Sequence, residues 1–118
     1  MHMAYRYLRE TVTGVLGSSV NFTWSFSGID NVVCGLTRPG YDDDLGERLI
    51  SIDRTGKFVA YAGRVSGSRG GNSSYSQVTL TISNISTGDE RGYVCHFKPS
   101  YMWDPSPVDY FFLAVEGL

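Results

Sequence analysis

Cys34 and Cys95 are the only thiols in this 118-residue chain, and they are the side chains most able to form a covalent bond. An even count fits one disulfide, although two buried free thiols would leave the same pattern. Three Asn-x-Ser/Thr sequons, at Asn21, Asn72 and Asn84, favour passage through the secretory route. Because that route is oxidising, we expect a disulfide and three glycosylation sites, with buried thiols as the alternative.

The run Asp42-Asp43-Asp44 offers oxygen ligands of the kind that Ca²⁺ prefers. It lacks the spaced ligands and the closing glutamate of an EF-hand loop. It follows a Pro-Gly pair and Tyr41, and is therefore more typical of a solvated turn. A third interpretation is an acidic patch that meets a basic partner. We predict no metal and no cofactor, and we keep this acidic segment, Tyr41 to Asp44, as a candidate partner-binding site.

The segment from Lys98 to Pro107 contains Tyr101, Met102 and Trp103 between prolines, and we call it the aromatic loop. Aromatic residues and methionine are enriched in the buried centres of protein interfaces. Proline reduces the entropy that a loop loses when it becomes ordered. The composition predicts contact with a protein partner, and the alternative is that Trp103 folds back onto its own sheet.

The sequence does not favour catalysis. His2 belongs to the start of the chain, and His96 directly follows Cys95. The chain contains neither a Ser/His/Asp order nor a nucleophile elbow. We therefore expect no enzyme activity, and we expect His96 to be a partly exposed strand residue.

Length and charge limit the classes of function. With 42% hydrophobic and 14% aromatic residues, 118 residues suit one domain with one core. We assign residues 1–3 to an expression vector and 4–118 to the domain. A formal net charge of −2 provides no basic field for nucleic acid or an acidic membrane. No apolar run approaches the roughly 20 residues of a membrane span.

Period-two alternation predicts strands throughout the chain. Val20, Phe22 and Trp24 alternate with polar residues, and the segment 78–83 alternates in the same way. Gly, Pro, Asp and Ser separate these runs, and a single helical turn is expected at 86–90. Residues 66–74 read as a loop or a loose strand. About eight or nine short strands indicate a sandwich or a barrel.

The run Asp89-Glu90-Arg91-Gly92-Tyr93-Val94-Cys95 resembles the Asp-x-x-x-Tyr-x-Cys signature of immunoglobulin domains. In that motif the tyrosine two residues before the cysteine ties a turn to the sheet through its hydroxyl. The resemblance implies this role for Tyr93.

Two further segments, 77–85 and 63–68, are similar to strands of variable-type (V-set) immunoglobulin domains. The resemblance extends from about residue 11 to residue 115. It implies an all-β immunoglobulin-like V-set sandwich of two antiparallel sheets with Greek-key connections. It also implies an ion pair between Arg64 and Asp89. In this fold the strands next to the acidic segment and the aromatic loop share one sheet, so the resemblance also implies that the two segments lie near each other.

One departure from the family concerns the position of the first cysteine. The run 17–24 resembles the strand that carries this cysteine, but Trp24 stands in its place. Cys34 stands about where the family has its buried tryptophan. The exchange implies that Cys34 meets Cys95 within one sheet, and that Trp24 covers the bridge from the opposite sheet.

A second departure concerns the last strand, 110–115, which lacks the Phe-Gly-x-Gly bulge of antigen-receptor variable domains. These departures and the sequons are similar to the V-like domains of colonial-cnidarian allorecognition receptors, the Alr-type family. That resemblance implies the extracellular part of a plasma-membrane protein that binds the same receptor on an apposed cell, without contacting nucleic acid or the membrane. The alternatives are a heterophilic immune or adhesion receptor, and a carbohydrate-binding V domain that uses Tyr101 and Trp103 for stacking.

Overall fold

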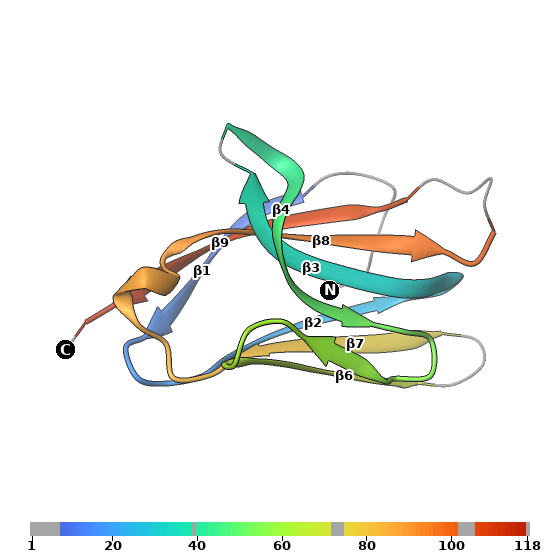
Figure 1. Ribbon diagram of the computed structural model, residues 1–118, viewed down its shortest axis with the longest axis horizontal. Coiled ribbons are helices and arrows are strands. Elements are labelled where there is room, and N and C mark those ends of the chain that lie inside the picture. The colour runs from blue at the N-terminus through green and yellow to red at the C-terminus, as the bar shows by residue number, and fades with distance from the viewer. Residues whose placement is uncertain (1–7, 39, 72–74, 102–105, 118) are drawn as a thin grey trace.

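The alternating sequence folds into strands that lie in two layers (Figure 1). The structure is a computed structural model, and it describes residues 8–38, 40–71, 75–101 and 106–117. These residues form nine strands and one short 3₁₀ helix. The strands are β1 (Leu8–Val15), β2 (Val20–Phe26), β3 (Ile29–Arg38), β4 (Tyr41–Ile52), β5 (Phe58–Ala60), β6 (Val65–Gly71), β7 (Ser76–Ile82), β8 (Arg91–Pro99) and β9 (Val108–Glu116); the 3₁₀ helix is η1 (Thr87–Asp89).

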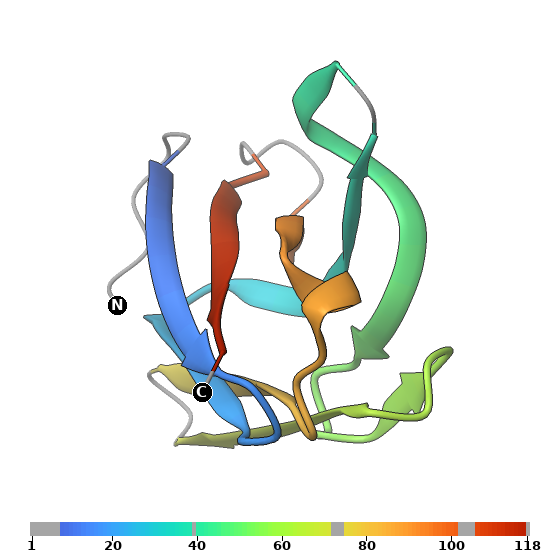
Figure 2. The same cartoon turned by 90° about the vertical axis from the view of Figure 1, so that its left-hand side faces the viewer.

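A six-stranded sheet, in the order β1-β9-β8-β3-β4-β5, packs on a three-stranded sheet, in the order β2-β7-β6. In Figure 2, β1 forms the left-hand margin of the larger sheet and β4 its right-hand side, with the smaller sheet below. The predicted all-β sandwich is confirmed. One pair departs from the expected antiparallel arrangement, because β1 pairs with β9 in parallel, from Leu8 opposite Asp109 to Val15 opposite Glu116.

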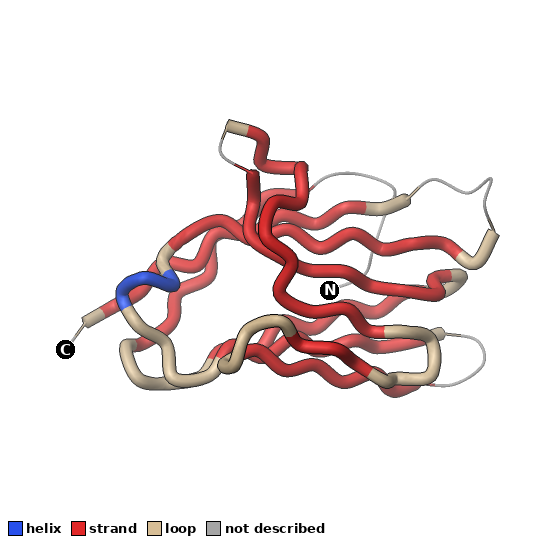
Figure 3. The backbone as a smooth tube through the Cα atoms, viewed as in Figure 1, coloured by secondary structure: helices blue, strands red, loops and turns tan. Residues whose placement is uncertain are grey.

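The core lies between the two sheets, and Figure 3 shows the strands in their two layers around it. Because strand side chains alternate between faces, every second residue of each inner face points into this space. The predicted inward residues of β2 and β7 are buried, except that Val20 is only partly buried, and Trp24 is 1% exposed. Aromatic rings fill the centre, with the Phe22 and Phe111 rings stacked at 4.0 Å between centroids.

Two segments differ from the sequence-based expectation. The acidic segment forms the start of the twelve-residue β4, directly after the turn that follows β3, rather than a solvated turn. The Gly-rich residues 65–71 form β6, which pairs with β7 along its whole length. The helical turn expected at 86–90 is present as η1.

Candidate partner-binding surface and the contacts that support it

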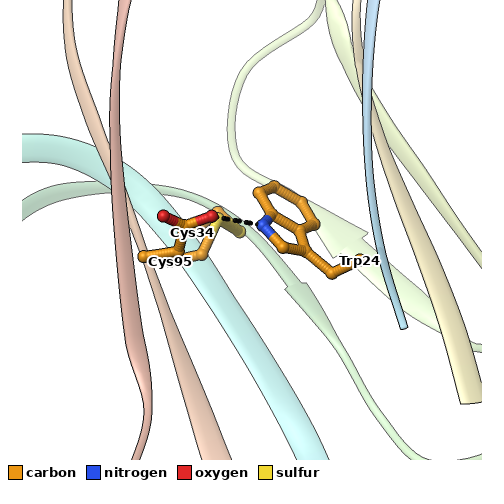
Figure 4. The surroundings of a disulfide bond; sticks show 4 residues. Trp24, Cys34 and Cys95 are labelled. Atoms are coloured by element: carbon orange, nitrogen blue, oxygen red, sulfur yellow. Dashed lines mark hydrogen bonds between the residues drawn. A yellow bond between two sulfur atoms is a disulfide. The ribbon is translucent and has the colours of Figure 1, made fainter. Parts of the chain in front are cut away.

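Cys34 on β3 and Cys95 on β8 form a disulfide bond, as expected. The two residues lie directly opposite each other in antiparallel register, with their Cα atoms 4.1 Å apart. Both strands belong to the six-stranded sheet, so this bond does not connect the two layers. Trp24 approaches the bridge from β2 in the other sheet (Figure 4). The tryptophan therefore still packs beside the disulfide, although the two residue types have exchanged positions.

Asp109 is a buried carboxylate that the sequence analysis did not identify. Its side chain is 0% exposed, and Trp24 Nε1 donates a hydrogen bond to its Oδ2 at 2.5 Å, the dashed line in Figure 4. The other oxygen, Oδ1, has no hydrogen-bond partner among the described residues. Burial raises the pKa of Asp109. The alternation of Phe111 and Leu113 was the available signal, because continuing it back by two residues places Asp109 on the inner face.

Arg64 and Asp89 form the expected pair at one end of the sandwich. The Arg64 guanidinium donates to both carboxylate oxygens of Asp89, at 2.6 and 2.8 Å. The side chains are 42% and 13% exposed, respectively. The hydrogen bonds from Arg64 lower the pKa of Asp89. The Tyr93 hydroxyl donates to the Asp89 carbonyl at 2.8 Å, and burial raises the pKa of Tyr93 to about 12.

The pair also borders a hollow of about 400 Å³ between the two sheets. Its lining combines this ion pair with apolar side chains, namely Leu36, Leu49, Val65 and Ile82. We assign no ligand to this hollow.

At the opposite end, Arg69 on β6 connects two turns of the chain and the start of β7. Its guanidinium lies 5.4 Å from the centroid of the Phe26 ring, and burial lowers its pKa. The guanidinium donates hydrogen bonds to the carbonyl oxygens of Ile29, Asp30 and Asp53 and to the hydroxyl of Ser76. The planar fork of arginine can bind several acceptors at once. Arg69 therefore links the β2–β3 turn, the β4–β5 turn and β7. Sequence reasoning missed this role, because Arg69 occurs in a Gly-rich segment that reads as a loop or a loose strand.

The aromatic loop joins this cluster of turns. Ser100 donates from its backbone to the Gly28 carbonyl at 2.8 Å and from its hydroxyl to Asp30 Oδ1 at 3.0 Å. Tyr101 follows directly and is 70% exposed. Met102 and Trp103 lie outside the described residues. The described part of the loop thus presents a large aromatic side chain to solvent from a braced backbone.

The acidic segment does not lie beside the aromatic loop, and the expectation that the two are close together is wrong. Ile29 pairs with Pro99 at the start of the aromatic loop, whereas Arg38 pairs with Tyr41 at the acidic segment. Ile29 and Arg38 are the ends of the ten-residue β3, which is about 30 Å long when extended. In Figure 1 the β3–β4 hairpin projects at the top of the molecule, whereas the end of β8 that leads into the aromatic loop lies on the right.

Within the acidic segment, the Asp44 carboxylate lies 3.7 Å from Arg38, with both side chains well exposed. The side chains of Tyr41, Asp42 and Asp43 lie outside the described residues. Among the residues that the structure describes, no group of three or more His, Cys, Asp or Glu is placed to hold a metal ion.

Two other expectations concern histidine and the membrane. His96 is half-buried on β8, where it pairs with Val33 and Val108. In the described part of the chain, no helix has the length and apolar content that crossing a membrane requires.

Of the three sequons, Asn21 and Asn84 lie on or next to the smaller sheet. Asn21 lies on β2, where its Oδ1 accepts a hydrogen bond from the Thr81 hydroxyl at 2.7 Å. Asn84 is exposed in the turn after β7 and has a positive φ of 50°. Asn72 lies outside the described residues, one position after the end of β6. Glycans at these positions would cover the smaller sheet and leave the larger one accessible.

Comparisons with known proteins support the fold. No protein-family model matches the chain, and no curated protein sequence matches it. Among solved structures, a VGSC beta subunit studied for multimeric cell-adhesive interactions superposes with a TM-score of 0.70 at 16% identity, over 92% of each chain. The NK cell receptor Nkp44, a triggering partner in natural cytotoxicity, also gives 0.70, at 15% identity, over 92% of this chain and 99% of the receptor.

A third solved structure is similar over the same length. The extracellular domain of the voltage-gated sodium channel beta4 subunit, described as a parallel homodimer that explains a role in cell–cell adhesion, gives 0.64 at 18% identity, over 93% of this chain and 92% of that one. Identities this low show the fold alone. By fold, this chain is an immunoglobulin-like V-type domain.

Proposed function

We propose that this chain is an extracellular recognition domain of a cell-surface receptor, and that its partner is the same receptor on an apposed cell. In the finer form of this proposal the receptor serves allorecognition, as the resemblance to the Alr-type family implies. A V-type sandwich is a platform for recognition loops, so the partner must be argued from the surface.

The similar solved structures support the coarser part of the proposal. One is described by its cell-adhesive interactions, one by a homodimer that explains cell–cell adhesion, and one as a receptor of immune cells. A formal net charge of −2 is compatible with self-association, because repulsion between two copies is small.

The observation that carries the proposal is the braced cluster of turns at the Arg69 end. Ser100 and Arg69 hold the aromatic loop, the β2–β3 turn and the β4–β5 turn together. A loop ordered before binding loses less entropy when a partner arrives. Exposed Tyr101 stands on this cluster, and an aromatic anchor of this kind is typical of an interface centre.

The remaining partner-binding candidates fit this picture less directly. The acidic segment lies at the other end of β3, so it serves in this proposal as a separate contact for a basic surface. The sequons at Asn21, Asn72 and Asn84 would direct binding away from the smaller sheet.

Aggregation of beads coated with the complete ectodomain tests the proposal. We expect matched ectodomains to aggregate and mismatched allelic variants to remain dispersed. Tyr101→Ala and Trp103→Ala should each weaken binding by about 2 kcal/mol or more, roughly thirtyfold. Leu16→Ala is the matched control, because Leu16 is an exposed apolar residue near the C-terminal end of β9.

Three outcomes would redirect the proposal. Native beads that stay dispersed but capture an unrelated protein would establish heterophilic binding. Selective binding to a glycan array would favour the carbohydrate-binding alternative, with Tyr101 and Trp103 as stacking residues. Normal aggregation by well-folded Tyr101→Ala and Trp103→Ala proteins, with unchanged far-UV CD and melting temperature, would exclude the aromatic loop as the contact.

A further inference from the structure

The short strand β5 gives the six-stranded sheet an apolar edge. All three of its residues are exposed. The side chains of Phe58 and Val59 are 43% and 51% exposed, and that of Tyr61, which follows, is 56% exposed. Sheet edges readily pair with other strands, and proteins usually protect them with charges, proline or bulges. The run from Lys57 to Tyr61 contains one charge, at its first position.

The backbone of β5 has hydrogen-bonding groups that face outward. In an antiparallel pair, every second residue bonds to the neighbouring strand. The Tyr61 N–H donates to the Leu49 carbonyl at 2.8 Å, so Val59 is the next residue that bonds to β4. The N–H and C=O groups of Phe58 and Ala60 therefore point to the open side. No strand of the described residues pairs with that side.

The other sheet edges are less suited to pairing. β2 carries the sequon at Asn21, and β6 ends directly before the sequon at Asn72, so glycans would obstruct both edges of the smaller sheet. The opposite edge of the larger sheet is β1, whose exposed side chains include Glu10, Thr11 and Thr13. β5 thus combines exposed apolar side chains, free main-chain groups and the absence of a sequon.

We propose that two copies of this chain pair through their β5 edges, antiparallel, about a two-fold axis at Val59. Phe58 of each copy then lies opposite Ala60 of the other, and these pairs exchange main-chain hydrogen bonds. The pairing matches a large side chain with a small one.

The same axis places Val59 opposite Val59 of the second copy. It also places Lys57 opposite Tyr61, where the ammonium group can lie against the phenol ring. No two like charges oppose each other in this register, so the edge is complementary to itself.

The geometry suits copies on opposed cells. An antiparallel two-fold pair points the C-terminal ends of the two domains in opposite directions. Under the proposed function, on which this step rests, each chain reaches its own cell from that end. The contact is small, below the roughly 1,200 Å² of a stable interface, so a single pair is weak. Many copies on two facing membranes strengthen such a contact by about 10² to 10⁴ through multivalency.

A cysteine placed on the axis tests the register. In a non-hydrogen-bonded antiparallel pair the Cα atoms are about 4.5 Å apart, which permits a disulfide. Under mild oxidation we expect Val59→Cys to give a covalent dimer on a non-reducing gel. Ala60→Cys is the matched control, because it is exposed on the same strand but lies opposite Phe58. We expect at least tenfold less dimer from this variant. Equal crosslinking of the two variants, or none by Val59→Cys, would overturn the pairing.

Bead aggregation separates this inference from the proposed function. Val59→Lys places like charges opposite each other, and we expect the aggregation rate to fall about tenfold. Native aggregation that is unchanged in Val59→Lys, without crosslinking of Val59→Cys, would refute the β5 edge and leave homophilic recognition standing. Specific crosslinking by a protein whose native beads never aggregate would contradict the proposed function and keep the edge contact.

Discussion

Arg69 offers the sharpest test of how the candidate binding end is held together. Replacing it with alanine removes the donors that reach the carbonyl groups of Ile29, Asp30 and Asp53, and it removes the cation from the Phe26 ring. We expect Arg69→Ala to loosen the β2–β3 and β4–β5 turns at once and to lower the stability of the whole sandwich, because these contacts join β6 to the six-stranded sheet.

The magnitude follows from the contacts. Each hydrogen bond from a charged group contributes about 1.5–3 kcal/mol, and the cation–π contact adds about 1 kcal/mol. Water can reach the turns at this end and replace part of the loss, so we expect about 3 kcal/mol in total rather than the sum. For a domain of this size that corresponds to a melting temperature roughly 10 °C lower. Arg69→Lys should recover little, because an ammonium group cannot bridge the same set of acceptors.

Urea denaturation followed by tryptophan fluorescence measures this change, and hydrogen exchange locates it. Arg54→Ala is the control, since Arg54 is an exposed arginine in the adjacent β4–β5 turn. We expect faster exchange at residues 28–30 and 53–57 in Arg69→Ala only. If Arg69→Ala moves the urea midpoint no further than Arg54→Ala does, Arg69 does not hold the turns together.

Three further predictions concern the ion pair, the buried carboxylate and the disulfide. Arg64→Ala should cost about 1–2 kcal/mol at pH 7, less than a buried pair would, because solvent screens the 42% exposed guanidinium. Since the folded-state pKa of Asp89 is lowered, its stabilisation is present above pH 4 and lost as the pH falls through that folded value. In urea titrations the variant should lose the larger part of this acid sensitivity, because the hydrogen bonds from Ser86 to Asp89 remain. Asp109→Asn should raise stability at pH 7 by about 1–3 kcal/mol, because it removes a buried charge whose pKa is raised. Alkylation of the native protein without reductant should label neither Cys34 nor Cys95, and replacing both with alanine should cost up to about 4 kcal/mol.

Each of these predictions has a clear contrary result. If the stability of Arg64→Ala falls at acid pH as steeply as that of the native protein, the ion pair contributes nothing to the pH dependence. The pH dependence expected from Asp109 is opposite to that from Asp89, because the pKa of Asp109 is raised in the folded state. The native protein should lose stability as the pH rises above about 4, and Asp109→Asn should show no such loss. A destabilised Asp109→Asn protein at pH 7 would mean that the ionised carboxylate is compensated in the folded state. Two alkylated thiols by intact mass would refute the disulfide.

The sequence predicted those parts of the fold that depend on local pattern. Alternation identified β2 and β7, and the spacing of Tyr93 and Cys95 identified β8. The parallel pairing of β1 with β9 could not be seen, because it joins segments about 100 residues apart and no local signal encodes which edge β1 selects. The role of Arg69 was hidden for the same reason, since its carbonyl acceptors lie 16 to 40 residues away.

The acidic segment shows a different limit. The sequence placed a turn correctly between β3 and β4, but it could not tell that β3 is long enough to carry that turn to the far end of β8. Strand length here depends on pairing with two neighbours and on bulges between Cys34 and Arg38. These are tertiary effects, so proximity of two loops cannot be inferred from their shared sheet.

The exchange of Trp24 and Cys34 changes what holds the two layers together. A disulfide within the larger sheet fixes β3 to β8, but in the described part of the chain no disulfide joins the smaller sheet to the larger one. Non-covalent contacts therefore join the layers, and they lie at three levels along the strands. The Trp24–Asp109 hydrogen bond and the contacts between aromatic rings hold the centre. Arg69 holds the end that carries the aromatic loop.

The third level is the Arg64–Asp89 pair, which holds the opposite end between β6 and the 3₁₀ helix that leads into β8. Arg69 lies on β6, and Arg64 directly precedes this strand. Contacts at both ends of β6 therefore connect the smaller sheet to the rest of the domain. Losing either clamp should open only its own end, because the other clamp and the aromatic centre remain.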